Sequence, residues 1–174
     1  KPTSGSITFA GDKIAGLSAN QISRKGIART FQLTALFEKL PVAANLALGY
    51  YKCTTSGFWG GILHTPQWKR DKKKVEEKVL QTLEFVGLGP RAFDIASTIS
   101  QGEQRLLSIG IALISDPKLI LFDEPTGGLI QEDTEMITEL IRKINRKGIT
   151  VCLIEHKMRM IMDLADRIVV LNYG

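Results

Sequence analysis

"LILFDEPTGGL", residues 119–129, carries the pattern that decides the fold of this chain. Four apolar residues predict a buried strand. Two adjacent carboxylates, Asp123 and Glu124, then end it, and a proline and two glycines follow. Burying an unpaired carboxylate is costly unless a cation or hydrogen-bond donors compensate it. The stretch therefore predicts either a cation site at the end of a buried strand or a surface turn that the two carboxylates cap.

Two further apolar runs follow this strand. They are "ITVCLIE" (149–155) and "DRIVVLN" (166–172), and helical patterns separate the three runs, the first at about 131–146. Uniformly apolar strands that alternate with helices are typical of a buried parallel sheet. We therefore predict an α/β fold with strand 118–122 inside it and with Cys152 as a buried thiol.

The first 32 residues predict a short hairpin, a short helix and a short strand. Residues 4–14 should form a β-hairpin with Gly11-Asp12 in its turn, residues 18–25 have helical character, and residues 26–32 should form a short strand. Three longer helices are predicted from apolar spacing, at 41–51, at 66–86 and from the "QGEQ" stretch to about 115. In the helix at 66–86, the predicted core positions are Val75, Val79, Leu83 and Val86.

Length, net charge and composition limit the classes of protein to which this chain can belong. The chain has 174 residues and a net charge of +5, which suits one domain with a sizeable core. The basic excess lies in "KRDKKKVEEK" (69–78) and predicts a solvated helix face, with a patch for nucleic acid or lipid headgroups as the alternative. No aromatics interleave with these lysines, which weakens the nucleic-acid alternative. Cys53 and Cys152 have no metal-like spacing, and no apolar run is long enough to cross a bilayer.

Polar residues gather at the ends of the predicted strands. These ends carry Gln32, then Asp123 and Glu124, then Glu155 and His156. Ligands of open α/β sheets bind at the carboxyl ends of the strands. An apolar strand that ends in Asp is the Walker B pattern, in which the Asp holds Mg²⁺, and the following Glu can polarise a water. A lone histidine at a strand end, such as His156, is more often a surface or capping residue than a ligand contact.

The stretch "SQGE" predicts a helix start. Ser100 followed by Glu103 is a capping box. Helix N-termini also present free N–H groups and the positive end of the dipole, and Gly102 allows close approach, so an anion could bind there. A well-capped helix with no ligand is the simpler alternative.

Taken together, these segments resemble the ABC-transporter ATPase family. "ISQGEQRLLSIGIALISDPKLILFDEPTGGL" is similar to its signature-to-Walker-B block, with "ISQGE" in place of "LSGGQ". Gln32 after "GIARTF" resembles the Q-loop glutamine, and His156 in "CLIEH" resembles the H-loop histidine. The resemblance runs from Gly5 to Gly174 in family order. "GIARTFQLTALFEKLPVAANL" and "LIEHKMRMIMDLADRI" are most similar to the ATPase subunits of branched-chain amino acid importers.

The resemblance implies roles for the residues at the strand ends. Asp123 and Gln32 would hold Mg²⁺, Glu124 would be the general base for ATP hydrolysis, and His156 would contact the γ-phosphate. The signature residues would bind ATP held by a second ATPase subunit, which implies a homo- or heterodimer; they are Ser100, Gln101, Gly102 and Glu103. ATP and Mg²⁺ are the implied ligands, and no nucleic acid is expected.

The resemblance also implies a division of the chain. Residues 1–37 and 102–174 would form a P-loop NTPase-like core, and residues 38–101 an inserted helical subdomain that touches the transmembrane permease. The protein would thus work peripherally, at the cytoplasmic face of the membrane. Apolar residues of the loop before the helix at 41–51 are candidates for that contact or for core packing; they are Leu36, Phe37 and Leu40. Arg29 and Arg105 are assigned structural roles.

Several positions depart from the family pattern. The phosphate loop G-x-x-x-x-G-K-[ST] is absent, so we expect a piece of a longer chain that is poorly active and poorly soluble alone, with exposed sheet edges. Ile130 stands where the family has Asp or Asn, and three further departures are Gln101, Ile111 and Lys157. A truncated, non-catalytic paralogue that docks on a permease or sibling ATPase is the alternative. An ATPase of DNA repair or translation is disfavoured, since no coiled coil or tandem copy is visible.

Overall fold

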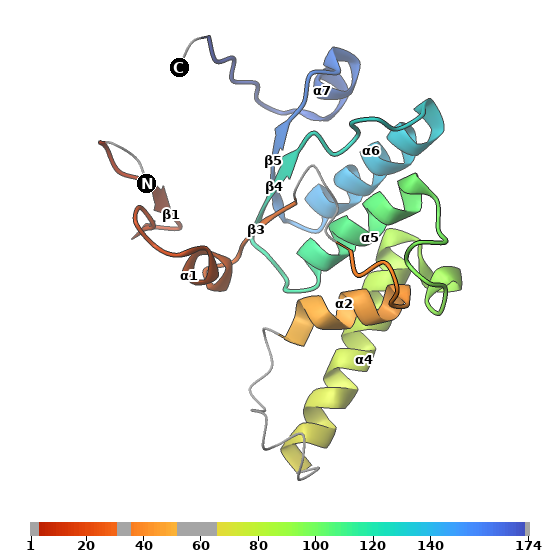
Figure 1. Ribbon diagram of the computed structural model, residues 1–174. Helices are drawn as coiled ribbons and strands as arrows, with labels where there is room; N and C mark the ends of the chain where they lie inside the picture. The colour runs from red at the N-terminus through yellow and green to blue at the C-terminus, as the bar shows by residue number, and fades with distance from the viewer. Residues whose placement is uncertain (1–3, 31–35, 52–65, 173–174) are drawn as a thin grey trace.

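The computed structural model describes residues 4–30, 36–51 and 66–172 (Figure 1). The predicted α/β fold is confirmed by a three-stranded parallel sheet in the order β3-β4-β5. The strands are β3 (Ile27–Arg29), β4 (Leu119–Asp123) and β5 (Thr150–Ile154). Asp123 is thus the last residue of the central strand, opposite Ile154.

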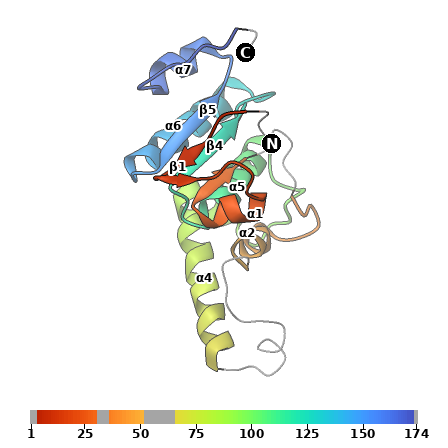
Figure 2. The ribbon, with the colours of Figure 1, turned by 90° about the vertical axis from the view of Figure 1, so that its left-hand side faces the viewer.

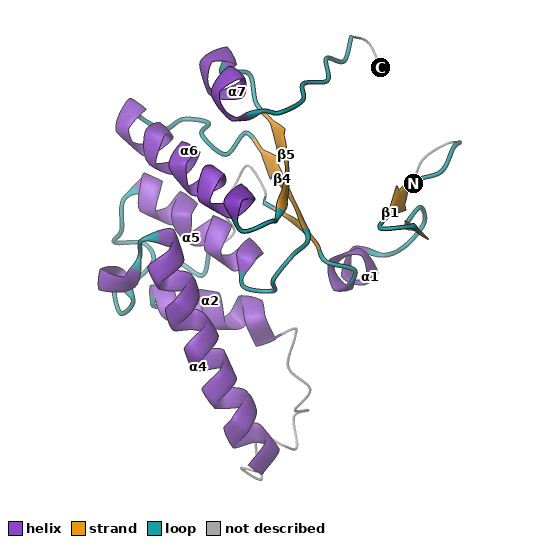
Figure 3. Cartoon of the chain, turned by 180° about the vertical axis from the view of Figure 1, so that it is seen from behind, coloured by secondary structure: helices purple, strands orange, loops and turns teal. Residues whose placement is uncertain are grey.

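Helices cover one face of this sheet. Helices α5 (Gln101–Leu113) and α6 (Gln131–Arg146) lie on the same side of the strands (Figures 1 and 3). Strand side chains that pack against the buried core alternate along each strand; they are Ala28, Ile120, Phe122, Val151 and Leu153. This alternation follows from the pleat, because successive side chains point to opposite faces.

The other face of the sheet is open among the described residues. Arg29, Leu121 and Cys152 share this face because they are register partners in neighbouring strands. Cys152 is exposed, and so is Ile154, two residues on. The prediction of a buried thiol is therefore wrong. The apolar run of β5 indicates burial on both faces, but helices pack on only one of them.

Three elements from residues 38–101 pack beside α5: α2 (Val42–Tyr51), α4 (Pro66–Val86) and the short 3₁₀ helix η1 (Gly89–Arg91). All four predicted core positions of α4 are buried. The N-terminal end of α4 extends away from the rest of the molecule (Figures 1 and 2). Lys72, Lys73 and Lys74 are exposed, and the first two pair along the helix with Glu76 and Glu77, as predicted for a solvated face.

The hairpin near the N-terminus forms with its turn one residue earlier than predicted. Strands β1 (Thr8–Phe9) and β2 (Asp12–Lys13) flank Ala10 and Gly11, which have φ angles of 50° and 86°. Two positive φ angles in succession are the geometry of a type I′ turn, which matches the twist of a hairpin. The helical character at 18–25 is confirmed by α1 (Ala19–Arg24).

The predicted strand at 166–172 is wrong. Helix α7 (Met158–Leu164) follows β5, and the described chain after it, to residue 172, forms no strand. The apolar side chains at 168–171 are exposed. A strand needs a neighbour for its backbone hydrogen bonds, and no described strand lies beside this segment. None of the described helices is both long enough and apolar enough to span a bilayer.

Candidate functional site

The carboxylate of Asp123 lies on the open face of the sheet and forms an ion pair with Arg29. Its Oδ2 accepts from Nη2 of Arg29 at 2.9 Å. Arg29 is the register partner of Leu121, two residues before Asp123, so both side chains emerge on the same face. Sequence reasoning assigned Arg29 a structural role, and the alternation of the two strands is the signal that would have placed it in the site.

Glu124 turns the chain away from the sheet. Its φ of 45° is left-handed, a conformation uncommon outside glycine. Its N–H donates to the Ile154 carbonyl at 2.9 Å, and its carbonyl accepts from the Gly127 N–H at 3.1 Å. The side chain faces the end of β5, where Oε1 lies 3.6 Å from Nδ1 of His156. The structure thus brings together Glu124 and His156, which are 32 positions apart in the sequence.

His156 is accessible, because 68% of its side chain is exposed. Its Nδ1 also lies 3.6 Å from Oε2 of Glu155. An imidazole held between two carboxylates, with most of its ring in solvent, can meet a ligand that arrives at the sheet edge. This arrangement favours a ligand-contacting role over a capping one.

Residues on either side of His156 bind the turn that follows Glu124. Thr126 donates its hydroxyl to the Glu155 carboxylate, and Lys157 Nζ donates to the Thr126 carbonyl at 3.0 Å. Lys157 also donates to the Thr134 hydroxyl in α6 at 3.2 Å. Sequence reasoning gave none of these residues a role at the site. Glu155 and Lys157 adjoin His156 in the sequence, which was their only signal, whereas Thr134 adjoins no predicted site residue.

The predicted capping box of α5 is present. Ser100 Oγ accepts from the Glu103 N–H at 3.2 Å, and Glu103 Oε2 accepts from the Ser100 N–H at 2.8 Å. Arg91 donates to the other oxygen of Glu103 at 3.0 Å. Burial raises the pKa of Glu103, but the hydrogen bonds from Ser100 and Arg91 outweigh it and hold that pKa below its ordinary value. Glu103 is therefore anionic at neutral pH and fixes the helix start.

Gly102 permits the close approach that was predicted, but its neighbour is Asp133 of the same chain. A Cβ at this position would lie 2.3 Å from Oδ1 of Asp133. The carboxylate thus lies against the start of α5, where the helix dipole favours negative charge. Helix α5 also contacts the turn that contains Gly127 and Gly128, because Arg105 donates to the Gly127 carbonyl at 3.5 Å.

The four remaining predicted positions have different surroundings. Ile130 is the N-cap residue of α6, is 66% exposed and offers no capping oxygen. Ile111 packs against the core beside Gly49 of α2, which explains an apolar residue there. Gln101 is exposed at the first turn of α5. Gln32 lies outside the described residues.

The residues at the sheet edge suit a magnesium ion in combination with other oxygen ligands. Among the described residues, no three His, Cys, Asp or Glu side chains form a metal-holding group. Asp123 nevertheless offers the carboxylate oxygen that Mg²⁺ prefers, and the Arg29 guanidinium already occupies a cation position beside it. The donor set therefore fits an ion that takes its other ligands from phosphate and water.

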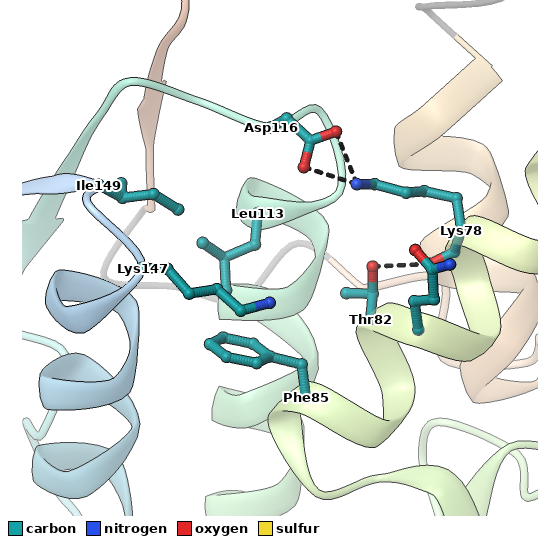
Figure 4. Close-up of a pocket in the computed structure, with 8 residues that line it drawn as sticks. Lys78, Thr82, Phe85, Leu113, Asp116, Lys147 and Ile149 are labelled. Atoms are coloured by element: carbon teal, nitrogen blue, oxygen red, sulfur yellow. Dashed lines mark hydrogen bonds and ion pairs between the residues drawn. The ribbon is translucent and has the colours of Figure 1, made fainter.

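A separate cavity of about 80 Å³ lies at the opposite, amino-terminal edge of the sheet (Figure 4). Lys78 Nζ pairs with both Asp116 oxygens, at 2.5 and 2.6 Å, and Lys147 Nζ lies 3.8 Å from the centre of the Phe85 ring. Both cations have partners within the chain, so these contacts join α4 to the segments before β4 and β5. The chemistry-bearing residues lie at the other edge.

A parallel sheet with an acidic pair at the end of its central strand and a capped helix beside it is typical of an α/β domain that binds a ligand at this edge of the sheet. The family profile described as "ABC transporter" matches residues 1–127. The chain belongs to the ABC transporter family.

Relatives and solved structures agree with this assignment. The branched-chain amino acid transport ATP-binding protein LivG of Salmonella typhimurium is 36% identical over 175 residues, which cover 100% of this chain and 69% of LivG. BraF of Pseudomonas aeruginosa is 35% identical with the same coverage. A nucleotide-free ATP-binding cassette from an ABC transporter superposes with a TM-score of 0.78 at 26% identity, covering 95% of this chain and 65% of that one.

A dimeric ATP-binding cassette bound to ADP and Pi superposes with a TM-score of 0.70 at 25% identity, covering 92% of this chain and 66% of that one. The chain thus spans about two thirds of the length of the proteins it matches. The predicted ABC ATPase fold is confirmed by these neighbours.

Proposed function

We propose that this protein is the ATP-binding and ATP-hydrolysing subunit of an ABC importer for branched-chain amino acids. The observation that carries the proposal is the edge formed by Asp123, Glu124 and His156, with Glu124 and His156 3.6 Å apart at the ends of neighbouring strands. The substrate class rests on LivG and BraF, which are named as branched-chain amino acid transport proteins.

Each residue of this edge has a role in hydrolysis. Asp123, with Gln32, would hold Mg²⁺, which supplies charge neutralisation to the phosphates when bound. Glu124 would accept a proton from the attacking water, a role worth about 10²–10⁴-fold in rate. The water attacks the γ-phosphorus, the bond to the β-phosphate oxygen breaks, and ADP and phosphate leave. His156 would hold a γ-phosphate oxygen through its exposed imidazole.

The start of α5 would serve a second subunit. Its backbone N–H groups at Gln101 and Gly102 lie at the positive end of the helix dipole, which favours an anion, and Ser100 and Glu103 fix this helix start through the capping box. The dimeric cassette bound to ADP and Pi supports a two-subunit arrangement. We therefore propose that these four residues contact ATP held by the partner ATPase subunit, so that a complete site needs two chains.

The permease contact is proposed for an apolar strip on residues 36–41 and 92–98. These segments pair through the Ala96 N–H and the Leu40 carbonyl at 3.0 Å and through the Ser97 N–H and the Glu38 carbonyl at 3.0 Å. The strip consists of exposed side chains on these segments, Phe37 (60%), Phe93 (91%) and Ile95 (37%). Such exposure of apolar groups is typical of a protein contact. We propose that the strip docks on a transmembrane permease at the cytoplasmic face of the membrane.

The buried amide of Asn45 fixes one end of the strip. It accepts from the Phe37 N–H at 2.8 Å and donates to the Phe37 carbonyl at 3.1 Å. Leu36 packs partly against the core instead. Of the three loop residues predicted for this contact, Phe37 thus suits it best, and residues 38–101 remain our proposal for the helical subdomain.

The alternative of a non-catalytic interaction module is not favoured. The relatives that match the whole chain are named ATP-binding proteins, and this chain retains both Glu124 and His156. Docking on a permease would need neither side chain. The phosphate loop is not among the 174 residues, so the decisive experiment uses the full-length protein.

That experiment is the substitution Glu124→Gln in the full-length protein. The amide keeps the shape but accepts a proton poorly, so ATP hydrolysis should fall about 10²–10⁴-fold while ATP binding is retained. Turnover is measured by phosphate release and binding by equilibrium titration. Met136→Gln, at an exposed position of α6, is the control and should change neither quantity. Unchanged hydrolysis in Glu124→Gln would refute the proposed role.

A further inference from the structure

Glu155 is a buried carboxylate immediately before His156, and the proposed mechanism does not use it. Its side chain has 0% exposed surface. A carboxylate in such a place needs hydrogen bonds to offset the loss of water. Glu155 has two: Thr126 donates its hydroxyl to Oε1, and the His156 N–H donates to Oε2 at 2.9 Å. The same side chain thus binds the turn after Glu124 and the backbone of His156.

Lys157 closes the arrangement from the other side of His156. Its Nζ donates to the Thr126 carbonyl at 3.0 Å and to the Thr134 hydroxyl at 3.2 Å. Thr126 is fully buried. Its hydroxyl binds Glu155 and its carbonyl binds Lys157, the two residues that flank His156. We call Thr126, Glu155 and Lys157 the 126–155–157 clamp.

The clamp joins the two segments that carry Glu124 and His156. Glu124 is two residues from Thr126, and His156 lies between Glu155 and Lys157, so their side chains are carried by the two clamped segments. Their Oε1 and Nδ1 atoms are 3.6 Å apart. Glu124 also has a left-handed φ, which persists only where the surroundings fix it.

We infer that the 126–155–157 clamp positions Glu124 relative to His156 for attack on the γ-phosphate. This inference rests on the proposed function. Glu155, Lys157 and Thr126 are positioning residues, because their hydrogen bonds act on the segments that carry Glu124 and His156. The charges of Glu155 and Lys157 matter to the clamp, since both act through hydrogen bonds to the buried Thr126.

The test compares two substitutions at Thr126 in the full-length protein. Thr126→Val keeps the shape but loses the hydroxyl, whereas Thr126→Ser keeps the hydroxyl. We expect kcat for ATP hydrolysis to fall about tenfold or more in Thr126→Val, with little change in KM, because misplacement by a fraction of an ångström costs turnover. Thr126→Ser should restore most of the lost turnover, and Glu155→Gln should behave like Thr126→Val.

A matched control separates positioning from general stability. Thr82 is also buried and donates its hydroxyl to the Lys78 carbonyl at 2.8 Å, inside α4. Thr82→Val therefore removes a comparable hydrogen bond far from the sheet edge and should leave kcat unchanged. If Thr82→Val lowers kcat as much as Thr126→Val does, or if Thr126→Val keeps wild-type turnover, the inference is overturned.

A second readout does not depend on hydrolysis. Hydrogen exchange is measured without nucleotide on a peptide that covers residues 150–160. Exchange of the His156 amide should speed up about tenfold in Glu155→Gln and Thr126→Val, and exchange across α5 should stay unchanged. Faster exchange in a protein that does not hydrolyse ATP would support the clamp and refute the proposed function. Unchanged exchange would overturn the clamp whatever the activity.

Discussion

Single side chains at the site act through several partners at once, and Glu103 is the clearest case. It accepts from the Ser100 N–H and from the Arg91 guanidinium while its own N–H donates to Ser100 Oγ. Burial opposes its charge and these donors favour it, so the pKa of Glu103 is lowered overall. A lowered pKa means that the folded state gains stability from the ionised carboxylate.

The pH dependence of stability should therefore contain a contribution from Glu103. It is fully present above the ordinary carboxyl pKa of 4.5 and is lost as the pH falls through the lower pKa of the folded state. Urea unfolding of the full-length protein should show Glu103→Gln to be less stable at pH 7, with the difference shrinking below about pH 4.5. A difference that stays constant from pH 7 to pH 3 would contradict this origin. Glu84→Gln, at an exposed position of α4, is the control.

Residue roles could be predicted where a motif has one local meaning. The Ser100 and Glu103 capping box depends only on spacing, and it formed as predicted. Arg29, Thr126 and Glu155 could not be assigned in this way, because their partners lie 29 to 94 positions away in the chain. The assignments of Glu124 and His156 to catalysis, and of Asp123 and Gln32 to Mg²⁺, stay predictions.

At the scale of secondary structure, α6 begins without a cap. Its N-cap residue is Ile130, which has the extended backbone of a cap but no side-chain oxygen for the free N–H groups of the first turn. Asn and Asp at this position are among the best caps, and Ile is among the poorest. A residue with a capping side chain at this exposed position would therefore stabilise α6.

Ile130→Asn should therefore stabilise the full-length protein by about 1 kcal/mol. The measurement is the midpoint of urea unfolding, which should rise. Met136→Asn places the same amide at an exposed position inside α6, where it cannot cap and has a lower helix propensity than Met, so that variant should be slightly destabilised. A loss of stability in Ile130→Asn would mean that Ile130 makes apolar contacts that outweigh capping.

The long helices and the central strand were predictable from apolar patterns, but the pairing of the last apolar run was not. The helix at 66–86 and the strand that ends at Asp123 follow directly from their apolar spacing. The segment at 166–172 has the same strand character as 149–155, yet only the latter pairs, with β4. Whether an apolar run becomes a strand depends on a neighbouring strand, which lies elsewhere in the sequence.

At the scale of the whole molecule, the apolar strip and the edge formed by Asp123, Glu124 and His156 are separate surfaces. The edge lies at the ends of β4 and β5, whereas the strip lies on segments that pair with each other beside α2. A protein that couples hydrolysis to transport needs both surfaces. Substitutions in the strip should thus separate coupling from catalysis.

Phe93→Ser tests this separation. The side chain is 91% exposed, so its loss should hardly change stability or basal ATP hydrolysis. Association with the permease should weaken about tenfold, as expected for an exposed aromatic anchor. Leu80→Ser is the control, because Leu80 is a 60% exposed apolar residue on α4, outside the strip. Equal effects of both substitutions on permease association would argue against the strip.

The open face of the sheet makes coverage of this surface measurable by thiol chemistry. Cys152 lies on that face in the edge strand β5, where a small alkylating reagent can reach it. In a Cys53→Ser background, the labelling rate at Cys152 reports whether anything shields the strand. A labelling rate close to that of a free thiol peptide would mean that strand β5 is exposed to solvent at Cys152. A rate at least about tenfold slower in a longer chain or an assembled transporter would reveal a covering layer.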